Sequence, residues 1–75
     1  MSTEDLLRSE IAVISDHIEL LARRRAEGEI TSLYPILQDT ADAVIYLRND
    51  APGYLQPDLR LLESRCANIL RSIAN

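Results

Sequence analysis

The sequence predicts an all-α fold, a small antiparallel three-helix bundle formed by one domain over residues 1–75. Leucine and isoleucine dominate the apolar residues, and the 75-residue chain has only two glycines and three prolines, a composition that favours helix. Apolar residues recur every three or four positions in three segments, and no alternating strand pattern is present. A chain this short buries only about 60% of its unfolded surface, so we also expect self-association to supplement a thin core.

The first helix is predicted over residues 3–27. One face of this segment is apolar at alternating spacings of four and three, through Leu7, Ile11, Ile14, Ile18 and Leu21. Three consecutive arginines close the segment at positions 23–25, where the helix dipole favours positive charge. Gly28 follows, and glycine is the preferred residue just beyond a helix because it tolerates positive φ.

The second and third helices are predicted over residues 33–48 and 57–73. Ser32 is the expected cap of the second helix, and Pro35 falls in its first turn, where a missing N–H costs nothing. Turn-forming residues crowd the stretch 49–57, and Pro57 is expected at the first position of the third helix. The apolar faces are Ile30, Leu33, Leu37, Ala41 and Val44, then Leu59, Leu62, Cys66, Ile69 and Ile73.

Each of the first two helices carries a second apolar stripe beside its main one, Leu6, Val13 and Leu20 in the first helix and Ile36, Ala43 and Leu47 in the second. The helix turns by roughly 100° per residue, which places both stripes on the same side of an antiparallel helix pair. We therefore expect a shared apolar groove, filled by the third helix or by a second copy of the chain. Tyr46 and Leu61 fall away from the main faces and are candidates for exposed contacts. The predicted partner interface is Leu6, Val13, Leu20, Ile36, Leu47, Tyr46 and Leu61.

The arginine cluster is interpreted as the end of a helix. Arg23, Arg24 and Arg25 point in three directions about 100° apart, so they do not converge on a phosphate. Arg23 lies four residues after Glu19, a spacing typical of an ion pair. The aliphatic stem of Arg25 is expected to cover the end of the bundle. A role in anion contact, for Arg8, Arg24 and Arg25, is the alternative.

No residue pattern predicts catalysis, a metal site or a bound cofactor. His17 is the only histidine and is interpreted as a half-buried side chain satisfied by Glu10 or by a backbone carbonyl, with a pH-sensitive role at the groove as the alternative. Cys66, the only cysteine, lies on an apolar face and is expected to be a small buried hydrophobe. A lone thiol forms no internal disulfide, which favours a reducing compartment and a cytoplasmic location.

The charge of the chain narrows the range of partners. The net charge is −4, with eight arginines and no lysine, and a duplex-DNA binder needs a basic face. We therefore expect no nucleic-acid partner, and Arg24 would be the residue to change in a test of nucleic-acid binding. We also expect no membrane association, because no apolar run is long enough to span a membrane. The predicted function is a non-enzymatic protein–protein interaction module: an adaptor, a small subunit, or an inhibitor that occludes a partner surface, of the kind that phages and other mobile elements encode.

The stretch "LLRSEIAVISDHIELLARRRA" (6–26) resembles the first helix of the all-helical chorismate mutases. The resemblance implies that Arg8 and Arg25 bind the carboxylates of a small anionic substrate on a dimeric helical scaffold. That family also uses a lysine further along the chain, where this sequence has Ile36. A mutase-like or other small-anion-binding helical dimer is therefore the alternative to an interaction module.

Overall fold

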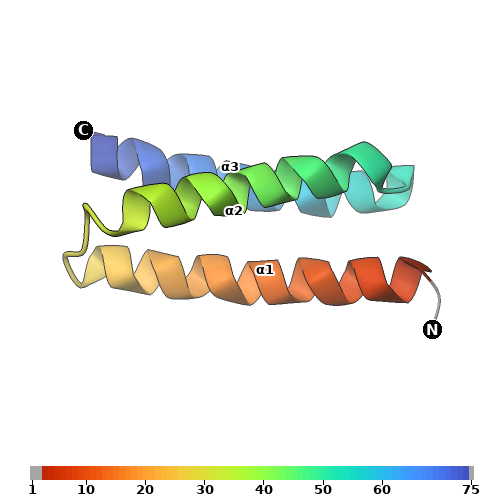
Figure 1. The fold of residues 1–75 in the computed structure, drawn as a ribbon, viewed down its shortest axis with the longest axis horizontal. Coiled ribbons are helices and arrows are strands. Elements are labelled where there is room, and N and C mark those ends of the chain that lie inside the picture. The colour runs from red at the N-terminus through yellow and green to blue at the C-terminus, as the bar shows by residue number, and fades with distance from the viewer. Residues whose placement is uncertain (1–2, 75) are drawn as a thin grey trace.

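The structure is a computed structural model that describes residues 3–74, and it is a bundle of three α-helices. The helices are α1 (Thr3–Ala26), α2 (Leu33–Asp50) and α3 (Gln56–Ala74), with the short 3-10 helix η1 (Gly53–Leu55) before α3. In Figure 1 each helix runs in the opposite direction to the one before it. The predicted all-α fold of three helices is confirmed, and each helix bound lies within two residues of the expected one. Residues 1, 2 and 75 of the predicted domain lie outside the described residues.

The connection from α1 to α2 begins with a Schellman motif at the predicted glycine. The N–H of Glu29 donates to the carbonyl of Arg24, and the N–H of Gly28 donates to the carbonyl of Arg25, both at 3.1 Å. Gly28 has a φ of +104°, a backbone conformation that costs a residue with a Cβ atom energy. The bonds satisfy carbonyls at the end of α1 that the helix itself leaves without donors.

The start of α2 differs in one respect from the prediction. Ser32 precedes the helix, but its side chain makes no capping hydrogen bond and its backbone is already helical. The hydroxyl donates instead to Glu29 Oε2 at 3.2 Å. Because the serine is engaged with the loop carboxylate, the first turn of α2 lacks the side-chain cap that the sequence suggested.

A side-chain amide fixes the connection from α2 to α3. Gln56 is the first residue of α3, with Pro57 second, and its Nε2 donates to the carbonyls of Arg48 and Ala51 at 2.7 and 3.1 Å. These two acceptors lie at the end of α2, where the last carbonyls have no partner within the helix. The amide therefore ties the beginning of α3 to the end of α2, beside an ion pair between Arg48 and Glu63.

The core consists of two groups of buried side chains along the main apolar faces. One group joins all three helices and contains Ile18, Val44, Leu59, Leu62 and Cys66. The other lies toward the α1–α2 loop and contains Leu21, Leu33 and Leu37. Ile69 of α3 packs against both groups and makes them continuous. Burial of Cys66 confirms its assignment as a small buried hydrophobe.

The position of α3 corrects one expectation. The third helix packs on the main apolar faces of α1 and α2, and it does not fill the groove between their second stripes. Leu6, Val13 and Leu20 of α1 are 53%, 67% and 50% exposed. The apolar residues of α3 lie on one side of the helix. This side packs on the two core groups, so α3 has no second apolar side that could cover the groove.

Candidate functional site

An open apolar cleft lies between α1 and α2. It has a volume of about 320 Å³ and is lined by Val13, Ile14, His17, Ile36, Asp39, Thr40 and Ala43. A second depression of about 300 Å³, lined by Leu6, Ser9, Glu10, Val13 and Ile14, adjoins it along α1. Val13 and Ile14 line both hollows, so the two form one surface, which we call the α1–α2 cleft. Among the described residues, its lining comes from α1 and α2 and not from α3.

The second stripe of α1 runs beside the α1–α2 cleft, and two of its members, Leu6 and Val13, line it. Leu6, Val13 and Leu20 are spaced by seven residues, which places them on one side of a helix. All three are at least half exposed. Single apolar residues on a surface are ordinary, but three on one side of α1 beside an apolar hollow give this side of the helix an excess of exposed apolar surface.

The second stripe of α2 is divided between the cleft and the core. Ile36 is half-buried and lines the cleft, and Ala43 lies exposed beside it. Leu47 is also half-buried, and both side chains pack on the core, Ile36 on the group of Leu21, Leu33 and Leu37 and Leu47 on the group around Val44. Unlike Ile36, Leu47 is absent from the lining of the cleft.

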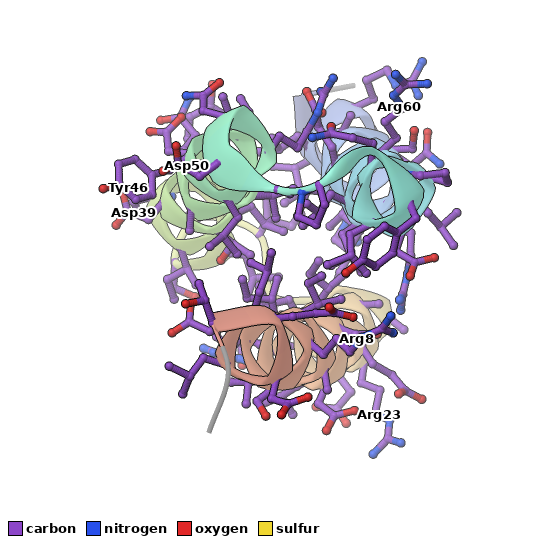
Figure 2. The ribbon with its side chains drawn as sticks, turned by 90° about the vertical axis from the view of Figure 1, so that its right-hand side faces the viewer. Arg8, Arg23, Asp39, Tyr46, Asp50 and Arg60 are labelled. Atoms are coloured by element: carbon purple, nitrogen blue, oxygen red, sulfur yellow. The ribbon has the colours of Figure 1, made fainter. Side chains whose placement is uncertain are left out.

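The two residues expected to fall away from the core are both exposed. Tyr46 of α2 is 71% exposed and Leu61 of α3 is 61% exposed. Figure 2 shows Tyr46 on the outer side of α2, together with Asp39, which lines the cleft. Leu61 belongs to α3, which contributes no described residue to the cleft lining. The predicted interface residues therefore do not form a single surface: Leu6, Val13 and Ile36 line the cleft, Tyr46 lies on the same helix as Asp39, and Leu61 is on α3.

Acidic side chains border the cleft without cationic partners. Glu10 and Asp39 lie in its lining, and Asp50 shares the side of α2 that carries Asp39 (Figure 2). Among residues 3–74, no hydrogen bond or ion pair engages these three carboxylates. In the same view the labelled arginines, Arg8, Arg23 and Arg60, point away from that side.

Several arginines make contacts across the seam between α1 and α3. Arg25 donates to the hydroxyl and the carbonyl of Ser72, both at 3.2 Å, and Arg65 donates to Ser15 Oγ at 3.3 Å. At the other end of this seam, Arg8 lies over the ring of Tyr54, with its Cζ 5.6 Å from the ring centroid. These contacts connect α1 to η1 and α3 along most of its length.

The Arg8–Tyr54 contact includes a carboxylate. Arg8 donates to Glu4 Oε1 at 3.2 Å from both Nε and Nη2. Hydrogen bonding from Tyr54, followed by that from Arg8, holds the pKa of the Glu4 carboxyl below its ordinary value. The same bond to Glu4 raises the pKa of Tyr54, because ionising the phenol would remove the donor.

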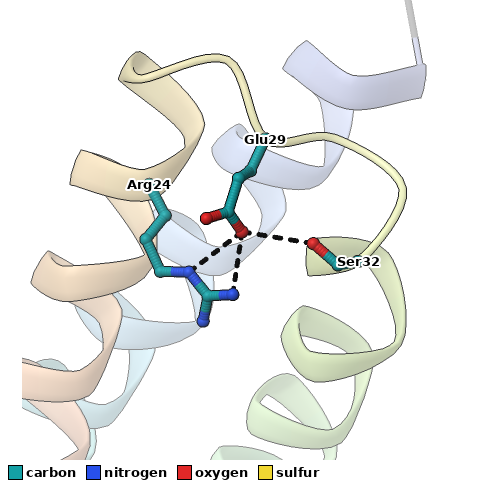
Figure 3. A network of polar contacts seen from close by, with 3 residues as sticks. All are labelled: Arg24, Glu29 and Ser32. Carbon is teal, nitrogen blue, oxygen red and sulfur yellow. Dashed lines mark hydrogen bonds and ion pairs between the residues drawn. The ribbon is translucent and has the colours of Figure 1, made fainter.

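Arg24 makes a polar contact with the loop at the end of the α1–α2 seam (Figure 3). Its Nε and Nη2 donate to Glu29 Oε2 at 3.0 and 2.8 Å, and Ser32 donates to the same oxygen. The Arg24 hydrogen bonds hold the pKa of Glu29 below its ordinary value, with a smaller contribution from Ser32. Arg24 and Glu29 are five residues apart and lie on the two sides of the helix end. The predicted ion pair between Arg23 and Glu19 is confirmed, with a distance of 3.6 Å between Nη2 and Oε1.

The candidate anion residues do not converge. Arg8 is held by Glu4 and Tyr54, Arg24 by Glu29, and Arg25 by Ser72. Arg8 and Arg25 are separated by roughly 25 Å along α1, from a rise of about 1.5 Å per residue. Within one chain the three guanidinium groups therefore form no shared site for a small carboxylate.

His17 and Cys66 have different surroundings. His17 is exposed and lines the cleft, so its expected half-buried position is wrong, because the groove above it is open. Burial raises the pKa of the Cys66 thiol, which disfavours the reactive thiolate. Among residues 3–74, no group of three or more His, Cys, Asp or Glu side chains could hold a metal ion. None of the described helices combines the length and the apolarity needed to cross a membrane.

Comparisons of the chain with protein-family models, with curated proteins and with solved structures find no significant match.

Proposed function

We propose that this chain is a non-enzymatic protein–protein interaction module that binds a partner through the α1–α2 cleft. The observation that carries the proposal is the uncovered strip of Leu6, Val13 and Leu20 beside an apolar hollow. Contiguous exposed apolar surface with a polar border is typical of protein interaction sites. An adaptor, a small subunit and an inhibitor that covers a partner surface would all use such a face.

The alternative of a small-anion-binding dimer gains no support from a particular observation. Its two arginines are bonded to neighbouring side chains and lie at opposite ends of α1. A simple measurement separates the two functions. Carboxylate-rich metabolites, chorismate among them, are expected to leave the melting temperature of the chain unchanged. A rise that the Arg25→Ala variant abolishes would contradict the interaction proposal.

Site-specific photocrosslinking tests the proposed face directly. A benzophenone side chain at position 13 is compared with one at position 61, because Val13 and Leu61 are both apolar and more than half exposed. In lysate of the source cells we expect a defined protein to crosslink from position 13 and not from position 61. Introducing Ala43→Leu into the first variant should abolish the product, because the added side chain occupies the cleft.

Equal crosslinking patterns from the two positions would show that the α1–α2 cleft is not a specific docking face. The same conclusion would follow if Ala43→Leu left the product from position 13 unchanged. Circular dichroism of each variant serves as the control, because all of them should retain the helical content of the parent chain.

A further inference from the structure

We propose that the occupant of the α1–α2 cleft is an amphipathic α-helix with basic flanks, contributed by a different protein. This inference rests on the proposed function and names the chemistry of the partner. It follows from two properties of the cleft: its helical spacing and its uncompensated negative charge.

The spacing of the exposed strip matches a helix lying alongside α1. Leu6, Val13 and Leu20 recur every seven residues and extend over about 21 Å, from the rise of 1.5 Å per residue. A partner helix of about 14 residues has the same length, and its apolar residues at i, i+3, i+4 and i+7 would contact the strip and the hollow together. The strip is straight and runs along the helix axis, which suits a fourth helix more than a loop.

The negative charge at the border of the cleft favours a partner with positive charge. Glu10, Asp39 and Asp50 have no cationic partner among residues 3–74. Among residues 3–74, the four arginines in ion pairs are bonded to Glu4, Glu19, Glu29 and Glu63 and not to these three carboxylates. Lysine or arginine on the flanks of a partner helix would be attracted to it and would fix its orientation, because charge complementarity governs encounter rate and specificity.

The same charges argue against a second copy of the chain as the occupant. A two-fold dimer interface brings the same patch of both copies together. Glu10 and Asp39 of one copy would then face an equally acidic border. Arg24, at the loop end of the seam, is already bonded to Glu29. Like charges without a compensating cation disfavour that pairing.

The test uses the full chain and two synthetic peptides of about 14 residues. Both carry the same leucine face at i, i+3, i+4 and i+7, one with lysine flanks and one with glutamate flanks. Binding is measured by fluorescence anisotropy at low and at physiological salt. We expect the lysine peptide to bind, to weaken as salt rises, and to bind at least tenfold more tightly than the glutamate peptide.

Three variants locate the binding. Ala43→Leu fills the cleft and should weaken the lysine peptide about tenfold or more. Asp39→Lys reverses a border charge and should weaken it about fivefold, a size typical of exposed charge pairs. Asp58→Lys makes the same charge change on α3, outside the cleft lining, and should leave binding within about twofold.

Four outcomes would overturn the inference. Equal binding of both peptides would remove the charge argument, and equal losses for Asp39→Lys and Asp58→Lys would show attraction to net charge alone. No binding of the lysine peptide would exclude this partner class. Light scattering that shows a dimer, lost in Ala43→Leu, would make a second copy the occupant. Each of these leaves the crosslinking result, and with it the interaction proposal, as a separate finding.

Discussion

The two seams that α1 shares with its neighbours are built differently. Along the α1–α3 seam, Arg8, Arg25 and Arg65 reach across to Tyr54, Ser72 and Ser15. Along the α1–α2 seam, Arg24 is paired with Glu29 at the loop end, and an open apolar cleft lies further along the seam. Long amphipathic arginines cover one seam and leave the other exposed, although both belong to the same helix.

The difference has a geometric cause. The apolar surface of α1 is wider than one stripe, since it includes the core face around Ile18 and the strip around Val13. Two neighbouring helices bury the core face, and no third neighbour within residues 3–74 is left for the strip. A helix whose apolar surface exceeds its intramolecular contacts has surface available for another molecule.

The largest expected effect compares the two apolar surfaces of α1. Ile18→Ala removes a fully buried side chain and should lower the free energy of unfolding by about 2–5 kcal/mol. That is a large part of the total for a domain of this size, on the order of 4–11 kcal/mol. Val13→Ala should change it by less than about 0.5 kcal/mol, because the side chain is exposed. Urea denaturation measures both, and equal losses would contradict an open cleft.

The next comparison lies within α2 and uses two alanines. Ala41 packs against the core group around Val44, whereas Ala43 lines the cleft. Ala41→Leu should cost about 1–3 kcal/mol because it overpacks a filled region. Ala43→Leu should be tolerated at no measurable cost, since the added side chain enters the hollow. A destabilised Ala43→Leu variant in the same denaturation experiment would show that α1 and α2 pack without space.

The two glycines test the connections at the ends of α2. Gly28 has a positive φ and Gly53 does not, and an added Cβ would meet no atom within 4 Å at either position. Gly28→Ala should therefore cost about 1–2 kcal/mol through backbone conformation alone. Gly53→Ala is the control and should be neutral or slightly stabilising, because alanine restricts the unfolded chain. Melting temperatures that fall equally in the two variants would contradict the Schellman geometry.

The smallest expected effect concerns the pH dependence of stability at the α1–α3 seam. The pKa of Glu4 is lowered by Tyr54 and Arg8, so its contribution to stability is present above the ordinary carboxyl pKa and is lost as pH falls through the lowered value. Tyr54→Phe should return the Glu4 pKa toward its ordinary value, as measured by the carboxyl carbon shift during an NMR titration. Tyr46→Phe, on the exposed side of α2, should leave it unchanged. An unaltered Glu4 pKa in Tyr54→Phe would show that the phenol is not the donor.

Helix positions and the core could be predicted from the sequence because the apolar period of 3.6 is a local property. The buried residues Ile18, Val44 and Cys66 all come from the predicted faces. The docking of α3 was not predictable in the same way, since periodicity defines the apolar side of a helix and leaves open which neighbour covers it. The open cleft depends on that choice.

The polar contacts also differ in whether the sequence alone predicts them. The Arg23–Glu19 pair follows from helical spacing alone. The bond from Arg24 to Glu29 depends on the path of the loop after Gly28, and the amide bonds of Gln56 depend on how two helices meet. The burial of His17 was predicted wrongly for the same reason. Its exposure depends on how the helices pack, because α3 packs on the core faces and leaves the cleft beside His17 open.

Cys66, the only cysteine of the chain, is buried in the middle of the bundle and can report how often the helices separate. Cys66 is fully enclosed where all three helices meet, so a disulfide reagent reaches it only during transient separation of the helices. Its modification rate reports the frequency of such openings without any engineered label. A helix bound in the α1–α2 cleft would slow that rate because it holds α1 and α2 together, so the modification rate of this buried thiol would report occupancy of the cleft.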